Sequence, residues 1–224
     1  MKQLLRFWHN NNLSIVLFTI FFAALVGMSI AGWRSANAEN ESHQQPTQTY
    51  TEYIQSGDFV EGVFENWESE FLQMWALVVL TIWLRQKGAD DSKPLRGKTA
   101  QDTTSRYSLL RAHTWHERKK ALGHVVYSHS LGAALLAIFF MSFALHAVGG
   151  ARMYNQEAAG HGQKESLSAF QYTQTSQFWY ESLQNWQSEF FAVASLLILS
   201  IKLRERSSPE SKPVGKKYDH ATGS

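Results

Sequence analysis

Two long apolar runs without formal charge constrain this chain more than any other feature. The first covers residues 13–31 and the second covers residues 131–149, and His146 is the only ionisable side chain in either run. A helix of that length extends about 28 Å, which is close to the thickness of the hydrocarbon core of a bilayer. The sequence therefore predicts two transmembrane helices in these runs.

Two shorter apolar runs cover residues 71–84 and 190–203. A run of this length is ambiguous by itself, since a core helix of a soluble protein has the same appearance. Upstream of the first run, large side chains recur every fourth residue at Phe59, Val63, Trp67 and Phe71. The second copy repeats this spacing with Phe178, Ser182, Trp186 and Phe190, and is less apolar at Ser182. This spacing puts them on one helical face, and Asp58 with Glu61 has the spacing of a capping box. We therefore expect two further transmembrane helices over about 65–84 and 184–203, each with an amphipathic outer extension.

The basic residues indicate how these four segments are oriented. Of the 21 Lys and Arg residues, 18 lie in residues 1–12, 85–130 and 202–224, and the others are Arg34, Arg152 and Lys164. Acidic residues have the opposite bias, since 12 of the 19 lie in residues 32–70 and 150–189. Because Lys and Arg are enriched in cytoplasmic loops, the sequence predicts four crossings with both termini and the middle loop in the cytoplasm.

The first apolar run has an alternative interpretation as a cleaved signal peptide. Lys2 and Arg6 would form its basic end, and Ala36-Asn37-Ala38 has the small-x-small pattern of a cleavage site. Against this, the run is long for a signal peptide, and the equivalent run at residues 131–149 cannot be one. We therefore prefer the transmembrane interpretation.

The chain repeats itself at an offset of 118 or 119 residues. The matching blocks are Asn66-Trp67-Glu68-Ser69-Glu70-Phe71 with Asn185-Trp186-Gln187-Ser188-Glu189-Phe190, and Asp91-Ser92-Lys93-Pro94 with Glu210-Ser211-Lys212-Pro213. Each copy holds two predicted crossings, so both copies enter and leave on the same side, as two tandem parallel hairpins. We place repeat 1 at residues 1–95, a cytoplasmic linker at 96–123 and repeat 2, with a basic cytoplasmic tail, at 124–224.

The doubled Asn-Trp-x-Ser-Glu-Phe and Ser-Lys-Pro blocks, with the terminal segment from Ser207 to Gly215, resemble a family of bacterial inner-membrane proteins of unknown function. The resemblance covers nearly the whole chain. It implies family membership and a membrane location, and it implies no activity.

The candidate functional residues lie at the predicted outer boundary of the membrane. Glu70 and Glu189 directly precede the short apolar runs, which puts both carboxylates at or just inside the hydrocarbon edge. Ionisable groups at such depth are costly and indicate a functional site. Neighbours three or four residues away share a helix face with each carboxylate. The candidate ion or ligand site therefore comprises Asn66, Trp67, Glu70, Asn185, Trp186 and Glu189.

A structural role for the same residues is the alternative, and we weigh it more heavily. Each Glu would then lie in interfacial water, where it caps a helix or pairs with Arg34 or Arg152, and each Trp would belong to the aromatic belt. His146 is likewise expected to be a packed, hydrogen-bonded histidine rather than a ligand.

A second candidate is a metal site in the two outer loops. Glu39 with His43, and Glu157 with His161, supply carboxylate and imidazole ligands in a matching Asn-x-Glu-x-x-x-His pattern. Two ligands per copy are too few unless the copies converge. A hydrogen-bond motif that orders each loop is therefore the preferred interpretation.

The sequence supports no enzyme class and no cofactor. The absence of Cys excludes disulfides, thiolate nucleophiles and CxxC sites, and no phosphate-binding loop, nucleophile elbow or Rossmann fingerprint is present. A formal net charge of +2 gives no reason to expect nucleic acid as a partner. We predict an all-α, non-catalytic structural or interaction protein of the bacterial inner membrane, with lipid, a second copy or an envelope protein as partner. The alternative function is a small ion, proton or solute pathway that uses Glu70 and Glu189.

Overall fold

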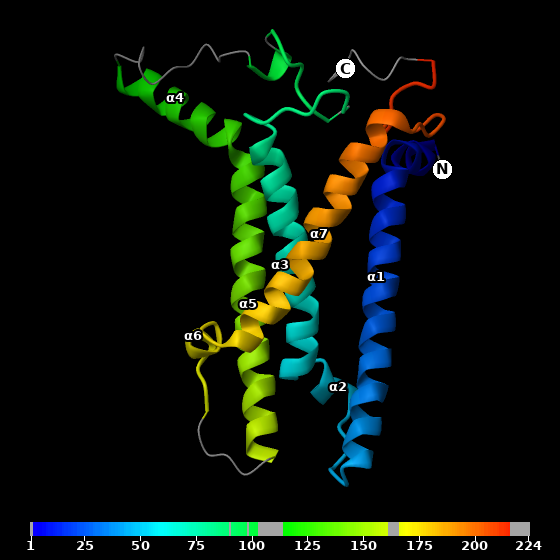
Figure 1. Ribbon diagram of the computed structural model, residues 1–224, viewed down its shortest axis with the longest axis vertical. Helices are drawn as coiled ribbons and strands as arrows, with labels where there is room; N and C mark the ends of the chain where they lie inside the picture. Colours follow the sequence, from blue (N-terminus) through cyan, green and yellow to red (C-terminus); the bar gives the residue numbers. More distant parts are fainter. Residues whose placement is uncertain (1, 90, 98, 103–113, 161–165, 216–224) are drawn as a thin grey trace. The chain divides into compact units, whose positions relative to one another are not determined.

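The protein is built from helices joined by turns and loops. The computed structural model describes residues 2–89, 91–97, 99–102, 114–160 and 166–215. The elements in chain order are α1 (Lys2–Ser42), α2 (Tyr50–Tyr53), α3 (Gly57–Leu80), the 3-10 turn η1 (Ala100–Asp102), α4 (Trp115–Ser128), α5 (Ser130–Gly160), α6 (Ala169–Tyr172) and α7 (Ser176–Lys202) (Figure 1). These described residues contain no β-strand, and the all-α prediction is confirmed.

Two of the described helices, α1 and α5, are long and apolar enough to cross a membrane. Residues 13–31 lie inside α1 and residues 131–149 lie inside α5, and both helices continue beyond those runs. α1 ends in a Schellman motif, in which the N–H of Gln45 donates to the carbonyl of Asn40 at 2.8 Å and Gln44 has a φ of 56°. The polar residues that follow the apolar run of α1 therefore remain helical up to this turn.

α3 and α7 contain the shorter apolar runs. α3 ends at Leu80 rather than at residue 84, and α4 begins at Trp115, inside the segment that the sequence predicts as linker. The Thr81 hydroxyl donates to the carbonyls of Leu77 and Val78. Such a bond competes with the helical ladder, and the chain tightens there into turns that link residues three apart.

Hydroxyl side chains cap α3 and α7. The Ser56 hydroxyl accepts from the N–H of Phe59 at 3.2 Å, and the Thr175 hydroxyl accepts from the first turn of α7 at 3.2 Å. The capping box expected from Asp58 and Glu61 is therefore wrong, because Asp58 already lies inside the first turn of α3.

The structure divides into two units, and the first contains residues 1–63 and 147–172. Two asparagines hold the loops of this unit in the same way. The Asn37 amide donates to the carbonyl of Gln48 at 2.9 Å, and its oxygen accepts from the N–H of Gln48 at 2.8 Å. Asn155 makes the same two bonds with Leu167, at 2.9 and 2.7 Å. Each bond pair ties a loop to the helix before it.

Glycine and tyrosine form a second matched contact in the first unit. Tyr53 at the end of α2 and Tyr172 at the end of α6 are both buried. A Cβ added to Gly32 would overlap the ring of Tyr53, and one added to Gly150 would overlap the ring of Tyr172. Only glycine therefore lets each ring seat against the long helix beside it.

The second unit contains residues 64–146 and 173–224. Within it α3, α5 and α7 lie side by side (Figure 1). Aromatic side chains of α5 and α7 face each other and form an aromatic core. The ring of Phe178 packs edge-on against Phe143 at 5.0 Å between centroids, and Phe139 contacts Trp186 at 6.4 Å. This core positions the polar cluster described below.

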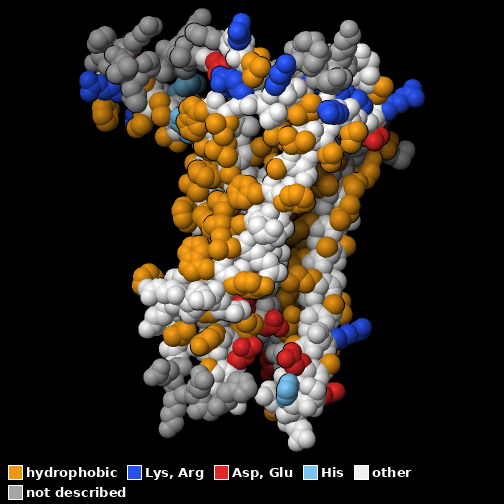
Figure 2. All heavy atoms as spheres, viewed as in Figure 1, with side chains coloured by type: hydrophobic (Ala, Val, Ile, Leu, Met, Phe, Trp, Pro, Cys, Tyr) orange, Lys and Arg blue, Asp and Glu red, His pale blue; other side chains and the backbone are white. Residues whose placement is uncertain are grey.

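The basic side chains of the second unit gather at one end of it. Figure 2 shows Lys and Arg over α4 and around the ends of α3 and α7. The loops that follow α3 and α7 carry most of them. α3, α4 and α7 therefore each have one end in the same basic region of this unit.

Candidate functional site

The two carboxylates of the predicted ion site, those of Glu70 and Glu189, lie at or near the surface of the protein. Glu70 on α3 is exposed and Glu189 on α7 is half-buried, and the two lie near enough for their charges to repel each other. Asn66 is exposed and Trp67 is half-buried. A role for these four side chains in binding an ion stays a prediction.

Asn185 and Trp186, the other two predicted residues, contact acidic side chains of α3. The Asn185 amide donates to Oε1 of Glu65, and the Trp186 indole N–H donates to Oε1 of Glu68 at 2.9 Å. Glu68 is fully buried. Both predicted residues therefore belong to a polar cluster whose centre lies elsewhere.

The centre of this cluster is His146 on α5. Its Nδ1 lies 2.8 Å from Oε2 of Glu68, and its Nε2 lies 3.4 Å from Oε2 of Glu181. The side chains of His146 and Glu68 are 0% exposed and that of Glu181 is 12% exposed. The histidine–carboxylate cluster is defined here as Glu65, Glu68, His146, Glu181, Asn185 and Trp186.

Aromatic rings enclose the cluster. The Phe178 ring stacks on the imidazole of His146 with 4.6 Å between centroids and 25° between planes. Trp179 packs edge-on against Trp186 at 6.2 Å. Because such rings exclude water, charges inside the cluster interact more strongly than they would at an exposed surface.

Two buried hydroxyls lie on the same helix faces as the cluster. Ser142 precedes His146 by one turn on α5, and Ser182 lies one turn before Trp186 on α7. Both residues are 0% exposed, and neither Oγ has a hydrogen-bond partner among the described residues. Buried polar atoms without a partner are rare in native structures and require an explanation.

The sequence analysis identified His146 as hydrogen-bonded but did not identify its partners. Glu68 and Glu181 lie 78 and 35 residues away in the chain, so no local spacing connects them to it. A signal was nevertheless present. Glu65 and Glu68 lie three residues apart on one face of a helix that otherwise turns apolar, which is an unusual place for two charges.

Three of the residues predicted as metal ligands, Glu39, His43 and Glu157, are exposed, and His161 lies outside the described residues. The prediction that these residues lie in loops is wrong for Glu39 and Glu157, because α1 and α5 continue through them as helix. Asn37 and Asn155, which open the two motifs, hold their loops through hydrogen bonds to the backbone. That arrangement agrees with the preferred loop-ordering interpretation, and the metal site stays a prediction.

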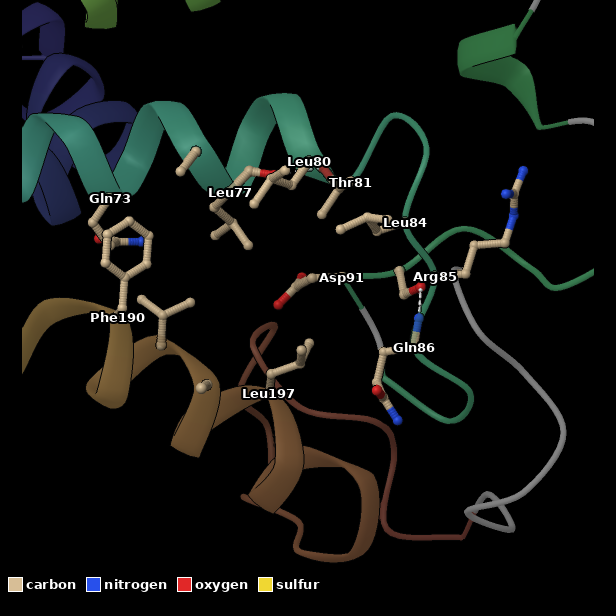
Figure 3. Close-up of a pocket in the computed structure, with 14 residues that line it drawn as sticks. Gln73, Leu77, Leu80, Thr81, Leu84, Arg85, Gln86, Asp91, Phe190 and Leu197 are labelled. Carbon is tan, nitrogen blue, oxygen red and sulfur yellow. Dashed lines mark hydrogen bonds between the residues drawn. The ribbon is translucent and has the colours of Figure 1, made fainter. Parts of the chain in front are cut away.

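A cavity of about 340 Å³ lies between α3 and α7 at the basic end of the second unit (Figure 3). Leu77, Phe190 and Leu197 contribute to its apolar lining, and Asp91 projects toward it. The cavity is thus a mainly apolar space bordered by the loop after α3.

The loop after α3 is joined to the C-terminal tail. The Ser92 hydroxyl accepts from the N–H of Gln86 at 2.7 Å, and Ser211 in the tail makes the equivalent bond with Glu205 at 2.9 Å. Lys212, which is 2% exposed, donates to a carbonyl of the α3 loop, that of Gly88, at 2.7 Å. The two Ser-Lys-Pro blocks therefore form similar turns that are tied together by one lysine.

Residues 4–224 match a family described as a domain of unknown function, DUF6766. The chain belongs to this family. The match confirms the membership of a family of unknown function that the doubled blocks suggest. No curated protein and no solved structure matches this DUF6766 chain.

Proposed function

We propose that this DUF6766 protein spans the bacterial inner membrane four times, through α1, α3, α5 and α7, with both termini in the cytoplasm. Its role is non-catalytic, as a structural or interaction protein of the envelope. The observation that carries the proposal is the exposure of apolar side chains around α1.

Large apolar side chains of α1 are exposed in several directions. Among them are Leu13 at 69%, Phe18 at 62%, Ile20 at 60% and Phe22 at 57% exposed. Successive residues of a helix are 100° apart, so these side chains do not share one face. A surface helix of a soluble protein carries a single apolar stripe, whereas a helix in lipid is apolar all round. α1 is therefore better suited to a lipid environment than to water.

The second unit offers similar support. The C-terminal half of α7 exposes Phe191 at 73%, Leu196 at 58% and Ile198 at 56%. The basic side chains gather at the end of the unit where α7 finishes (Figure 2), as the excess of Lys and Arg in cytoplasmic loops requires. A transmembrane helix that ends in the cytoplasm is expected to be apolar and to be followed by a basic loop, and α7 has both features.

Matched contacts support the interpretation of the chain as two hairpin repeats. Asn37 and Asn155 make equivalent pairs of bonds, and Ser92 and Ser211 close equivalent turns. Equivalent contacts at an offset of 118 or 119 residues are the expected result of a duplicated structural unit. In this proposal each hairpin crosses the membrane twice.

The interaction role is assigned to the outer segments, residues 53–71 and 172–190. Trp179 and Tyr180 are 42% and 67% exposed there. Aromatic side chains with a polar tip favour the membrane interface and protein contacts. The partner is lipid headgroups, an envelope protein or a second copy of this chain.

Two experiments on the full chain test this proposal. Membranes that contain the protein are washed with alkaline carbonate, and the chain is expected to stay in the membrane pellet. A photo-crosslinking amino acid is then placed at Tyr180, with Tyr127 on α4, 79% exposed, as the matched control. A discrete adduct is expected at Tyr180 but not at Tyr127. Release by carbonate contradicts the membrane location, and an absence of adducts at Tyr180 contradicts the interaction role.

A further inference from the structure

We propose that the histidine–carboxylate cluster is a binding site for one divalent transition-metal ion such as Zn²⁺, held between His146 Nε2 and Glu181 Oε2. Neither His146 nor Glu181 is among the ligands that the sequence pattern suggests. It does not depend on how many times the chain crosses the membrane.

Glu68 fixes which nitrogen of His146 carries a proton. Its Oε1 accepts the indole N–H of Trp186 at 2.9 Å, and its Oε2 lies 2.8 Å from Nδ1 of His146. An ionised carboxylate only accepts hydrogen bonds, so Nδ1 must be the donor in this contact. When the imidazole is neutral, its single N–H is on Nδ1, and Nε2 carries the lone pair that can bind a metal ion.

That lone pair faces another electron-pair donor. Nε2 of His146 lies 3.4 Å from Oε2 of Glu181, which is longer than a normal hydrogen bond between nitrogen and oxygen. In the neutral form of the ring these two acceptors repel each other, so either a proton on Nε2 or a metal ion between the two atoms must hold them together.

The separation of the two donor atoms fits a metal ion. A tetrahedral Zn²⁺ binds imidazole nitrogen and carboxylate oxygen at about 2.0–2.2 Å, which holds the two donors about 3.3–3.5 Å apart. The observed separation is 3.4 Å. Imidazole with carboxylate is a ligand set that suits Zn²⁺ and its neighbours rather than Ca²⁺ or Mg²⁺.

The contact between Glu68 and His146 resembles the hydrogen bond that orients a metal-binding histidine from the side away from the metal. A histidine that binds zinc usually donates its other N–H to a carboxylate, which fixes the ring and raises its basicity. Glu68 is in that position, and Trp186 in turn fixes Glu68. Phe178 stacks on the ring and holds its plane. The imidazole is therefore oriented before any ion binds.

The two buried hydroxyls are the second observation that points to a ligand. Ser142 and Ser182 lie on the faces of α5 and α7 that carry His146 and Trp186, and neither Oγ is hydrogen-bonded among the described residues. His146 and Glu181 are only two protein ligands, but unlike the exposed outer residues they are 0% and 12% exposed and already face each other, so water can fill the other positions of a four-coordinate ion. Water bound to the ion would offer a hydrogen-bond partner to a buried hydroxyl on either of these faces.

The burial pattern indicates where an ion enters. Glu181 is 12% exposed, whereas His146 and Glu68 are 0% exposed. The site therefore opens on the side of Glu181, and the ion would join α5 to α7 there. Binding to the folded chain alone stabilises it, so added metal should raise the melting temperature.

The test uses the full chain, purified in detergent without chelator and then freed of metal. Zn²⁺ binding is measured by isothermal titration calorimetry, and Co²⁺ is used as an optical probe of the ligands. We expect one Zn²⁺ per chain, a Co²⁺ absorption band in the visible range and a rise in melting temperature with Zn²⁺. His146→Gln should abolish all three, because no other imidazole belongs to the cluster.

Two further variants separate a ligand from a supporting residue. Glu181→Gln should lower the affinity by at least about tenfold, because it removes a charged ligand, and its partial exposure keeps the change compatible with folding. Glu68→Gln should lower the affinity by about 10- to 100-fold while it preserves one ion per chain. If His146→Gln does not fold, as judged by circular dichroism and gel filtration, Glu181→Gln carries the test alone.

The matched controls come from the exposed carboxylates and histidines of the same chain. Glu70→Gln on α3 and the double variant Glu39→Gln with His43→Ala should bind Zn²⁺ as the unchanged chain does. The proposal is overturned if neither Zn²⁺ nor Co²⁺ binds, because a shared proton then occupies the gap. It is also overturned if Glu181→Gln has no effect on affinity, or if the variant at Glu39 and His43 abolishes binding.

Discussion

The outer contacts of the first unit and the polar cluster of the second unit use the repeated sequence in opposite ways. In the first unit, residues that are identical in the two copies make the same contacts, as Asn37 and Asn155 do. In the cluster, the key residues differ between the copies. Glu68 corresponds to Gln187, Glu181 to Gly62, and His146 to Met28.

The contacts that occur twice and the histidine–carboxylate cluster differ in kind. Contacts that occur twice tie loops to helices and involve no buried charge. The cluster gathers its buried charges in one place, from positions where one copy is acidic or basic and the other is not. Residues that are the same in the two matching stretches of sequence make the repeated contacts, and the charged residues of the cluster lie at positions that differ between them.

The largest effect is expected where two helices approach through glycine. A Cβ added to Gly149 on α5 would lie 2.5 Å from the backbone nitrogen of Glu61, and backbone atoms cannot move aside as a flexible side chain can. Gly149→Ala should destabilise the protein by about 3 kcal/mol. Thermal unfolding in detergent, followed by circular dichroism, measures the loss.

The matched control for this variant is Gly27→Ala on α1. An added Cβ there meets no atom within 4 Å, so the higher helix propensity of Ala should leave the stability unchanged or raise it by at most roughly 1 kcal/mol. Equal melting temperatures for the two variants would show that the close approach at Gly149 does not hold the unit together.

The paired asparagines should behave as equivalents. Asn37→Ala and Asn155→Ala each remove two side-chain bonds to a loop backbone and leave an N–H and a carbonyl without these partners. Each should cost about 1–3 kcal/mol, and the two losses should be similar. Thermal unfolding again provides the measurement. A large loss from one variant and none from the other would break the equivalence of the two copies.

The short helices α2 and α6 should differ in their response to pH. Hydrogen bonds from the backbone N–H and the hydroxyl of Thr49 hold the pKa of Glu52 below its ordinary value. Since this pKa is lower in the folded chain, ionised Glu52 stabilises α2 at neutral pH, and that contribution is lost as the pH falls below about 4.5 through the lowered value. At the matching position in α6, Gln171 accepts from the N–H of Ser168 at 2.9 Å and does not titrate.

Hydrogen exchange measures this difference. Protection of residues 49–54, corrected for the intrinsic exchange rate, should fall between pH 6 and pH 3.5, whereas protection of residues 168–173 should not. Glu52→Gln should make the two segments alike. A parallel loss of protection in both segments would mean that Glu52 does not control the cap.

The smallest effect is expected from the carboxylates that the sequence analysis selected. Glu70 is exposed and Glu189 is half-buried, so Glu70→Gln together with Glu189→Gln should change the melting temperature little. Proteoliposomes with the unchanged chain and with this double variant should show equally low proton and cation flux. Flux through the unchanged chain that collapses in the double variant would instead establish the ion pathway.

The sequence predicted those parts of the structure that depend on local patterns. Apolar runs identified the helices that contain them, and the repeated blocks identified residues such as Asn37 and Asn155 that matter to the loops. The end of α3 was not predicted, because it depends on a single hydroxyl, that of Thr81, and on the turns that follow. The cluster was not predicted because its bonds connect three helices. A pattern of spacings records which residues share a face but not which faces meet.

The most direct test of the account is the side of the membrane on which the middle loop lies. Alkaline phosphatase, active only in the periplasm, and green fluorescent protein, fluorescent only in the cytoplasm, are fused after Gln45, Thr103, Lys164 and the C-terminus. The account predicts phosphatase activity after Gln45 and Lys164, and fluorescence after Thr103 and the C-terminus. Phosphatase activity after Thr103 would contradict it.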